Sequence, residues 1–98
     1  MTGTDLIARR IVVRGKVQGV FYRNWTMLTA RSLRLKGWVR NRSGGEVEIL
    51  AIGPQEDLDD FERQCWEGPY GAKVTEVTSE KAQVEPLRTF EKRPTVRA

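Results

Sequence analysis

The feature that most constrains the fold is that the spacing of apolar residues before residues 15–23 (GKVQGVFYR) differs from the spacing after them. Before this segment, residues 8–14 (ARRIVVR) are rich in β-branched side chains and alternate, which predicts a strand. After it, apolar and small side chains recur three and four residues apart, which predicts an amphipathic helix. That helical stripe consists of Tyr22, Trp25, Thr26, Thr29, Ala30 and Leu33. The glycine-containing segment therefore connects a strand to the amino end of a helix.

Residues 36–53 predict two strands joined by a glycine-containing turn at residues 42–45. In the second of these strands, apolar residues alternate with Glu46 and Glu48. Such alternation is expected when only one face of a sheet is covered.

A second helix is predicted to begin at Pro54, with acidic residues in its first turn. Its buried stripe is Leu58, Phe61 and Cys65. Residues 73–78 are strand-like, but their two valines are three residues apart, which indicates either an irregular strand or a bulge. A short last strand is expected at residues 89–92.

This order of elements, strand, helix, strand, strand, helix, strand, is the split βαβ plan. We therefore predict an α+β, ferredoxin-like sandwich (βαββαβ) with two helices packed on one face of an antiparallel sheet. The 98 residues are expected to form a single domain, residues 1–98, with a core of about residues 8–93 and ends that fray beyond about Leu6 and Arg93. The tryptophans are predicted to serve packing: Trp25, Trp38 and Trp66.

The chain contains no histidine and one cysteine, Cys65, which is predicted to lie in the core. These counts exclude histidine-based acid/base catalysis, serine-histidine triads, an internal disulfide and cysteine-based metal sites. The net charge of +4 favours anionic partners without distinguishing a phosphorylated metabolite from nucleic acid. Because the chain has no apolar run of membrane length and no apolar centre near its amino terminus, we expect the protein in the cytoplasm. We also expect it to be a monomer.

The segment at residues 15–23 has the chemistry of an anion site. Backbone N–H groups of a glycine-containing loop that opens into a helix form a concave donor array, and the helix dipole adds positive potential. Arg23, in the first helical turn, adds a guanidinium that matches phosphate oxygens. The alternative is a loop that only turns a corner, with Arg23 solvated. Asn41 has two possible roles as well: an ordinary turn residue, or an amide that orients a water.

Two segments resemble the signatures of the acylphosphatase family: GKVQGVFYR at residues 15–23 and GWVRN at residues 37–41. Residues 45–54 (GEVEILAIGP), residues 67–69 (EGP) and residues 89–91 (TFE) are also similar to that family. The resemblance covers roughly residues 8–93, and two motifs at this separation are highly specific.

The resemblance implies an enzyme that hydrolyses an acyl phosphate, a mixed anhydride, to a carboxylate and inorganic phosphate. Arg23 would bind the phosphoryl group, Asn41 would position the attacking water, and a phosphoryl oxygen of the substrate could take the water proton. No metal, cofactor or covalent intermediate is implied, and phosphate or sulfate should occupy the loop. The backbone N–H groups that would cradle the phosphate oxygens are those of Lys16, Val17, Gln18, Gly19, Val20 and Phe21.

Two residues depart from the family pattern. Arg34 stands where the family usually ends the first helix with glycine, a position that favours the left-handed backbone region. Lys92 stands in the last strand where the family often has an apolar residue, and neither departure is expected to touch the site.

Two other functions compete with the enzyme. One is a non-catalytic anion-binding or regulatory domain. The other is an RNA-binding module of the same fold class, which the sequence disfavours because it shows no aromatic platform and because Glu46 and Glu48 would repel the nucleic-acid backbone. Neither nucleic acid nor a membrane is expected as a partner.

Overall fold

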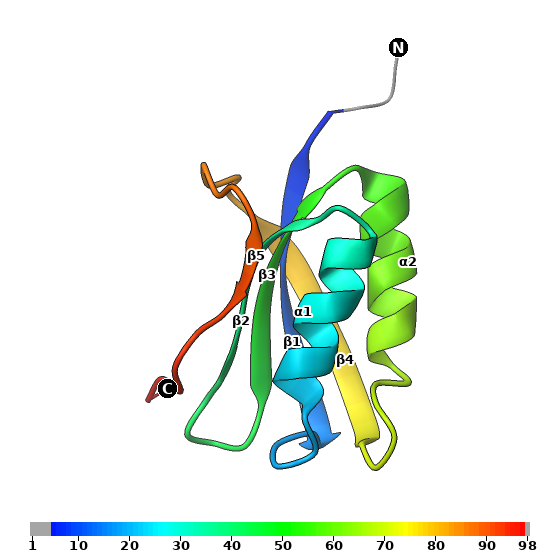
Figure 1. Ribbon diagram of the computed structural model, residues 1–98, viewed down its shortest axis with the longest axis vertical. Coiled ribbons are helices and arrows are strands. Elements are labelled where there is room, and N and C mark those ends of the chain that lie inside the picture. Colours follow the sequence, from blue (N-terminus) through cyan, green and yellow to red (C-terminus); the bar gives the residue numbers. More distant parts are fainter. Residues whose placement is uncertain (1–4, 98) are drawn as a thin grey trace.

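The computed structural model describes residues 5–97, and it forms a curved sheet with two helices on one face (Figure 1). The elements follow the predicted order along the chain. They are β1 (Ile7–Lys16), α1 (Tyr22–Ser32), β2 (Lys36–Asn41), β3 (Val47–Gly53), α2 (Gln55–Cys65), β4 (Lys73–Ala82) and β5 (Phe90–Lys92).

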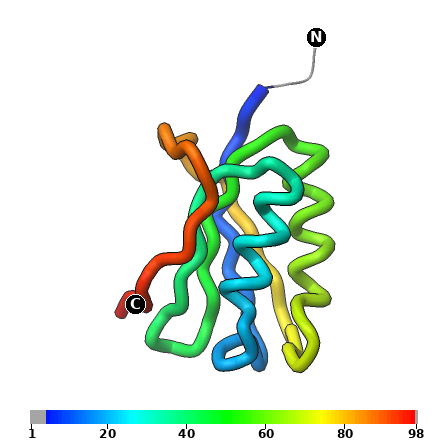
Figure 2. Tube along the Cα trace, in the orientation of Figure 1, coloured from blue at the N-terminus to red at the C-terminus, as the bar shows by residue number. Residues whose placement is uncertain are grey.

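The strands lie in the order β4-β1-β3-β2-β5, and the two helices cover one face (Figure 2). Three of the four strand pairs are antiparallel, as predicted, but β5 pairs in parallel with β2. The ferredoxin-like α+β fold is therefore confirmed, with the correction that its sheet is mixed.

The main core lies between the helices and the sheet, and the predicted helical stripes form its helical side. Tyr22, Thr26 and Ala30 of α1 are buried, as are Leu58, Phe61 and Cys65 of α2. Phe61 and Phe90 meet edge to face across this core. Burial raises the pKa of the Cys65 thiol to about 12, as expected of a cysteine that serves packing.

The predicted bulge lies in β4, opposite the end of β1. Arg14 pairs with Glu76 while Gly15 pairs with Val74, which leaves one extra residue on β4. This extra residue explains how Val74 and Val77, three apart in sequence, both pack against the main core.

The sheet face opposite the helices differs from the prediction. Glu48 does point to that face, but β3 is buried along its whole length and Glu48 is only 2% exposed. Desolvation would raise the pKa of Glu48, but hydrogen bonds from Arg40 and Arg10 outweigh it and hold the pKa below its usual value. The alternation of residues within β3 could not predict these ion pairs, because Arg10 and Arg40 come from the neighbouring strands β1 and β2.

Two of the three tryptophans serve packing as predicted. Trp38 is buried on the same face as Glu48, where the guanidinium groups of Arg40 and Arg93 lie over its ring. Trp25 packs against the main core. Trp66 is the exception, since it is 51% exposed.

The segment after β5 is attached to the sheet, contrary to the prediction that the chain frays beyond Arg93. The N–H of Arg93 donates to the carbonyl of Val39, and the N–H of Val96 donates to the carbonyl of Asn41. The corresponding prediction for the amino end, before Leu6, falls mostly outside the described residues. Neither helix within residues 5–97 has the length and apolar content to cross a bilayer.

Candidate active site

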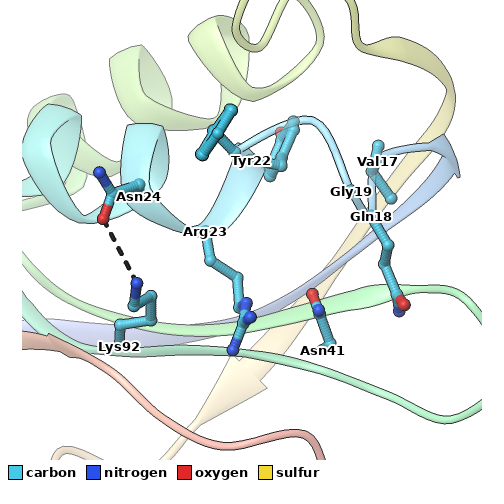
Figure 3. Close-up of a pocket in the computed structure, with 9 residues that line it drawn as sticks. Val17, Gln18, Gly19, Tyr22, Arg23, Asn24, Asn41 and Lys92 are labelled. Carbon is cyan, nitrogen blue, oxygen red and sulfur yellow. Dashed lines mark hydrogen bonds between the residues drawn. The ribbon is translucent and has the colours of Figure 1, made fainter.

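A pocket of about 370 Å³ lies where the β1–α1 connection, the end of β2 and β5 come together (Figure 3). The β1–α1 connection and the β2–β3 turn are at the same end of the sheet, which brings residues distant in sequence to one place (Figure 1). The lining residues are Val17, Gln18, Gly19, Phe21, Tyr22, Arg23, Asn24, Asn41 and Lys92.

The path of the β1–α1 connection depends on two glycines. At Gly15, with φ of 123°, an added Cβ would lie 2.1 Å from the carbonyl oxygen of Lys73. Gly19 has φ of 75°, and no atom lies within 4 Å of the place where a Cβ would be. Glycine therefore suits this position because of its backbone conformation and not because space is short.

The same connection is fastened to the β2–β3 turn by Gln18. Its side-chain amide nitrogen donates to the carbonyls of Arg42 and Glu46, both at 2.9 Å. Because these bonds occupy the side-chain nitrogen of Gln18, its contribution to an anion site would come from its backbone N–H.

The amino end of α1 faces the pocket and lacks the usual side-chain cap. Phe21 occupies the capping position in the left-handed region, with φ of 61°, and it makes no side-chain capping hydrogen bond. The first turn of α1 carries no acidic residue. The first backbone N–H groups of a helix have no acceptor within the helix, and the dipole favours negative charge beside them. This helix end therefore suits an anionic ligand.

Arg23 projects from that first turn into the pocket (Figure 3). Its Nη1 donates to the carbonyl of Arg93 at 3.1 Å, which fixes the guanidinium. Among the described residues it has no carboxylate partner, so the remaining donors of its planar fork are available to phosphate oxygens.

Asn41 projects from the end of β2. In Figure 3 it lies on the same side of Arg23 as Gln18 and Gly19 of the β1–α1 connection. Its Oδ1 is buried and has no hydrogen-bond partner among the described residues. Buried polar atoms normally have a partner, so this oxygen suits an incoming donor such as a water O–H.

The structure brings together six of the eight predicted site residues. Lys16 and Val20 do not line the pocket: Lys16 is exposed, and Val20 packs against the core. A cradle of backbone N–H groups does not require the side chains to face the ligand, so the backbone roles of Lys16 and Val20 stay predictions.

Three lining residues were missed by the sequence analysis: Tyr22, Asn24 and Lys92. Tyr22 positions the helix end, because its hydroxyl donates to the carbonyl of Cys65 at 2.6 Å. Burial raises the pKa of Tyr22 far above its ordinary value, which keeps the hydroxyl protonated for this bond. The expectation that the departure at Lys92 does not touch the site is wrong, because Lys92 lines the pocket. The signal was present in the sequence, since Lys92 shares a strand face with buried Phe90.

Known proteins resemble this chain in both sequence and fold. A family model described as Acylphosphatase matches residues 9–92. A protein named acylphosphatase from Rhizorhabdus wittichii is 42% identical over 92 residues, covering 94% of this chain and 93% of that protein. One of the same name from Nitrobacter hamburgensis is 41% identical, covering 94% of this chain and 99% of that protein.

Among solved structures, an acylphosphatase from Coxiella burnetii superposes with a TM-score of 0.89 at 38% identity. The match covers 95% of this chain and all of that one. The chain belongs to the acylphosphatase family.

Proposed function

We propose that this protein hydrolyses acyl phosphates to a carboxylate and inorganic phosphate, and that the pocket described above is its active site. The observation that carries the proposal is that one pocket contains Arg23, the amino end of α1 without a side-chain cap, and the Oδ1 of Asn41, which has no partner among residues 5–97. Family membership supports the same reaction.

The phosphoryl group would bind at the β1–α1 connection, where its oxygens accept hydrogen bonds from backbone N–H groups and from the Arg23 guanidinium. These donors match the charge that spreads over three equatorial oxygens during phosphoryl transfer. Residues 16–21 supply the backbone donors in this proposal.

Asn41 would hold the attacking water through its Oδ1. The water oxygen bonds to phosphorus while the bond from phosphorus to the bridging oxygen breaks, and the bridging oxygen leaves with the carboxylate. The water proton passes to a phosphoryl oxygen, which gives dihydrogen phosphate or, after ionisation, hydrogen phosphate. Because a carboxylate is a good leaving group, no protein acid is needed to protonate it.

The second candidate, a non-catalytic anion-binding domain, shares the same helix end and Arg23 but gives the Asn41 oxygen no role. The buried Oδ1 of Asn41 therefore favours the enzyme. The monomeric state, the cytoplasmic location and the organisation of residues 1–98 as one domain stay predictions from the sequence.

The test is hydrolysis of benzoyl phosphate, followed by loss of its ultraviolet absorbance in the presence of EDTA. We expect turnover by the wild type, a fall in kcat/KM of about 10²-fold or more for Arg23→Ala, and a fall of similar order for Asn41→Ala. Arg63→Ala is the matched control, because Arg63 is exposed on α2 and pairs with Asp60 away from the pocket.

Circular dichroism would establish that each variant is folded. Absence of turnover by folded wild type, together with binding of inorganic phosphate, would favour the non-catalytic domain and contradict the proposal.

A further inference from the structure

Lys92 is a second basic residue in the pocket, and its placement follows from strand geometry. β5 is only three residues long, and Phe90 and Lys92 point to the same face because side chains alternate along a strand. Phe90 is buried beneath the helices, whereas Lys92 pairs with Val39 farther along the strand and is exposed beside the first turn of α1.

The ammonium group of Lys92 has a weak partner. Its Nζ lies 3.5 Å from Oδ1 of Asn24, the outer limit of a hydrogen bond, and within the described residues it pairs with no carboxylate. Four arginines of the sheet are paired with carboxylates: Arg9, Arg10, Arg14 and Arg40. None of the described residues that line the pocket is acidic. The pocket therefore holds a cationic group that the fold itself does not neutralise.

The position of Lys92 relative to Arg23 assigns it to one end of the substrate. In Figure 3, Gln18, Gly19 and Asn41 lie on one side of Arg23, and Lys92 with Asn24 lies on the other. In phosphoryl transfer the attacking and leaving oxygens are roughly in line through phosphorus. If the water is held by Asn41, the leaving carboxylate and its acyl group extend away from Asn41, toward the Lys92 side of the pocket.

We propose that Lys92 is a specificity-determining residue that binds a second anionic group, a carboxylate or phosphate, carried on the acyl part of the substrate. This inference rests on the proposed function, because it takes the phosphoryl group to bind at the β1–α1 connection. The enzyme would therefore prefer acyl phosphates whose acyl part carries an anionic group over acyl phosphates whose acyl part is uncharged.

The test compares benzoyl phosphate with 4-carboxybenzoyl and 3-carboxybenzoyl phosphate, whose rigid rings prevent attack of the second carboxylate on the anhydride. A neutral isostere, 4-carbamoylbenzoyl phosphate, controls for size. Lys92→Met is expected to lower kcat/KM for at least one of the two carboxylated substrates about three- to fivefold, the range of an exposed ion pair, and to leave benzoyl and carbamoylbenzoyl phosphate within twofold. Lys92→Arg should restore the preference, and Lys92→Glu should lower it further.

A matched control is Lys81→Met, which removes one exposed charge from β4 outside this pocket. It should leave the ratio of carboxylated to neutral substrate unchanged, and so separates a local contact from the effect of net charge. The effect of Lys92→Met should also shrink in 0.5 M salt.

Two results would overturn the inference while leaving the proposed function intact. One is turnover of all the substrates with ratios that do not change in Lys92→Met. The other is an equal loss on every substrate, accompanied by weaker inhibition by inorganic phosphate, which would assign Lys92 to the phosphoryl group instead. Failure of the proposed function looks different, because then benzoyl phosphate itself would not be hydrolysed by the wild type.

Discussion

A residue with a left-handed backbone conformation lies at each end of α1, but the hydrogen bonding around the two residues differs. Among the described residues, Phe21 at the amino end and Arg34 after the carboxyl end are the non-glycine residues in the left-handed region, both with φ of 61°. At the carboxyl end the N–H of Leu35 donates to the carbonyl of Ala30 at 2.9 Å, and the N–H of Arg34 donates to the carbonyl of Arg31 at 3.0 Å. That end is closed by the chain itself.

The amino end is left open by comparison. Phe21 supplies no side-chain cap, the first turn has no acid, and Phe21 is 82% exposed at the pocket. A non-glycine residue in the left-handed region costs roughly 1 to 2 kcal/mol. At the carboxyl end the left-handed residue accompanies carbonyls that accept hydrogen bonds, whereas at the amino end it accompanies backbone N–H groups that have no acceptor within the helix. Substitutions at the first end should therefore change stability, and substitutions at the second should change activity.

The largest expected effect belongs to Arg23→Lys. It keeps the charge but loses the planar fork, so kcat/KM for benzoyl phosphate should fall about 10²-fold. Arg34→Lys, the same chemical change at the other end of the helix, should leave kcat/KM within twofold. Equal losses in both variants would contradict the assignment of function to the amino end.

Next in size is stabilisation by a bound anion. Inorganic phosphate at about 100 times its dissociation constant should stabilise the native state by about 2.7 kcal/mol, measured as a rise in the urea midpoint. Arg23→Ala should lose most of this gain at the same phosphate concentration, and Arg34→Gly should keep it. A gain that survives in Arg23→Ala would locate the anion elsewhere.

Arg34→Gly should increase the free energy of unfolding by about 1 kcal/mol, because glycine adopts the left-handed region without the Cβ penalty. Arg34→Ala keeps a Cβ and should show little of this gain, which makes it the control. In both variants kcat/KM should stay at the wild-type value, and a fall in either would mean that the carboxyl end reaches the site.

The smallest effect in stability is expected for Asn24→Asp. A carboxylate in the first turn complements the helix dipole and should stabilise α1 by about 0.5 kcal/mol in chemical denaturation. The same charge lines the pocket and should raise the inhibition constant of inorganic phosphate severalfold. If stability and phosphate affinity rose together, the amino end of α1 would not be the anion site.

Much of this fold could be predicted because its information is local. The stripe of Leu58, Phe61 and Cys65 is buried as its spacing requires, and Arg34 has the left-handed backbone that is common directly after the C-cap of a helix, here Leu33. The three-residue spacing of Val74 and Val77 in β4 is explained by the bulge in that strand.

The features that were missed depend on partners far along the chain. The direction of β5 is set by its pairing with β2, and no pattern within three residues encodes it. The burial of Glu48 depends on arginines of β1 and β2. For the candidate site, the two motifs placed Arg23 and Asn41, but only the β2–β5 pairing brings Lys92 to the pocket.

The double hydrogen bond of the Gln18 side chain has a consequence for the kinetics of binding. Since the connection is already fastened to the β2–β3 turn, its residues lose their conformational entropy when the protein folds and not when an anion arrives. Capture then needs no slow closing of this loop, and the encounter rate depends on diffusion and on the field of the basic side chains.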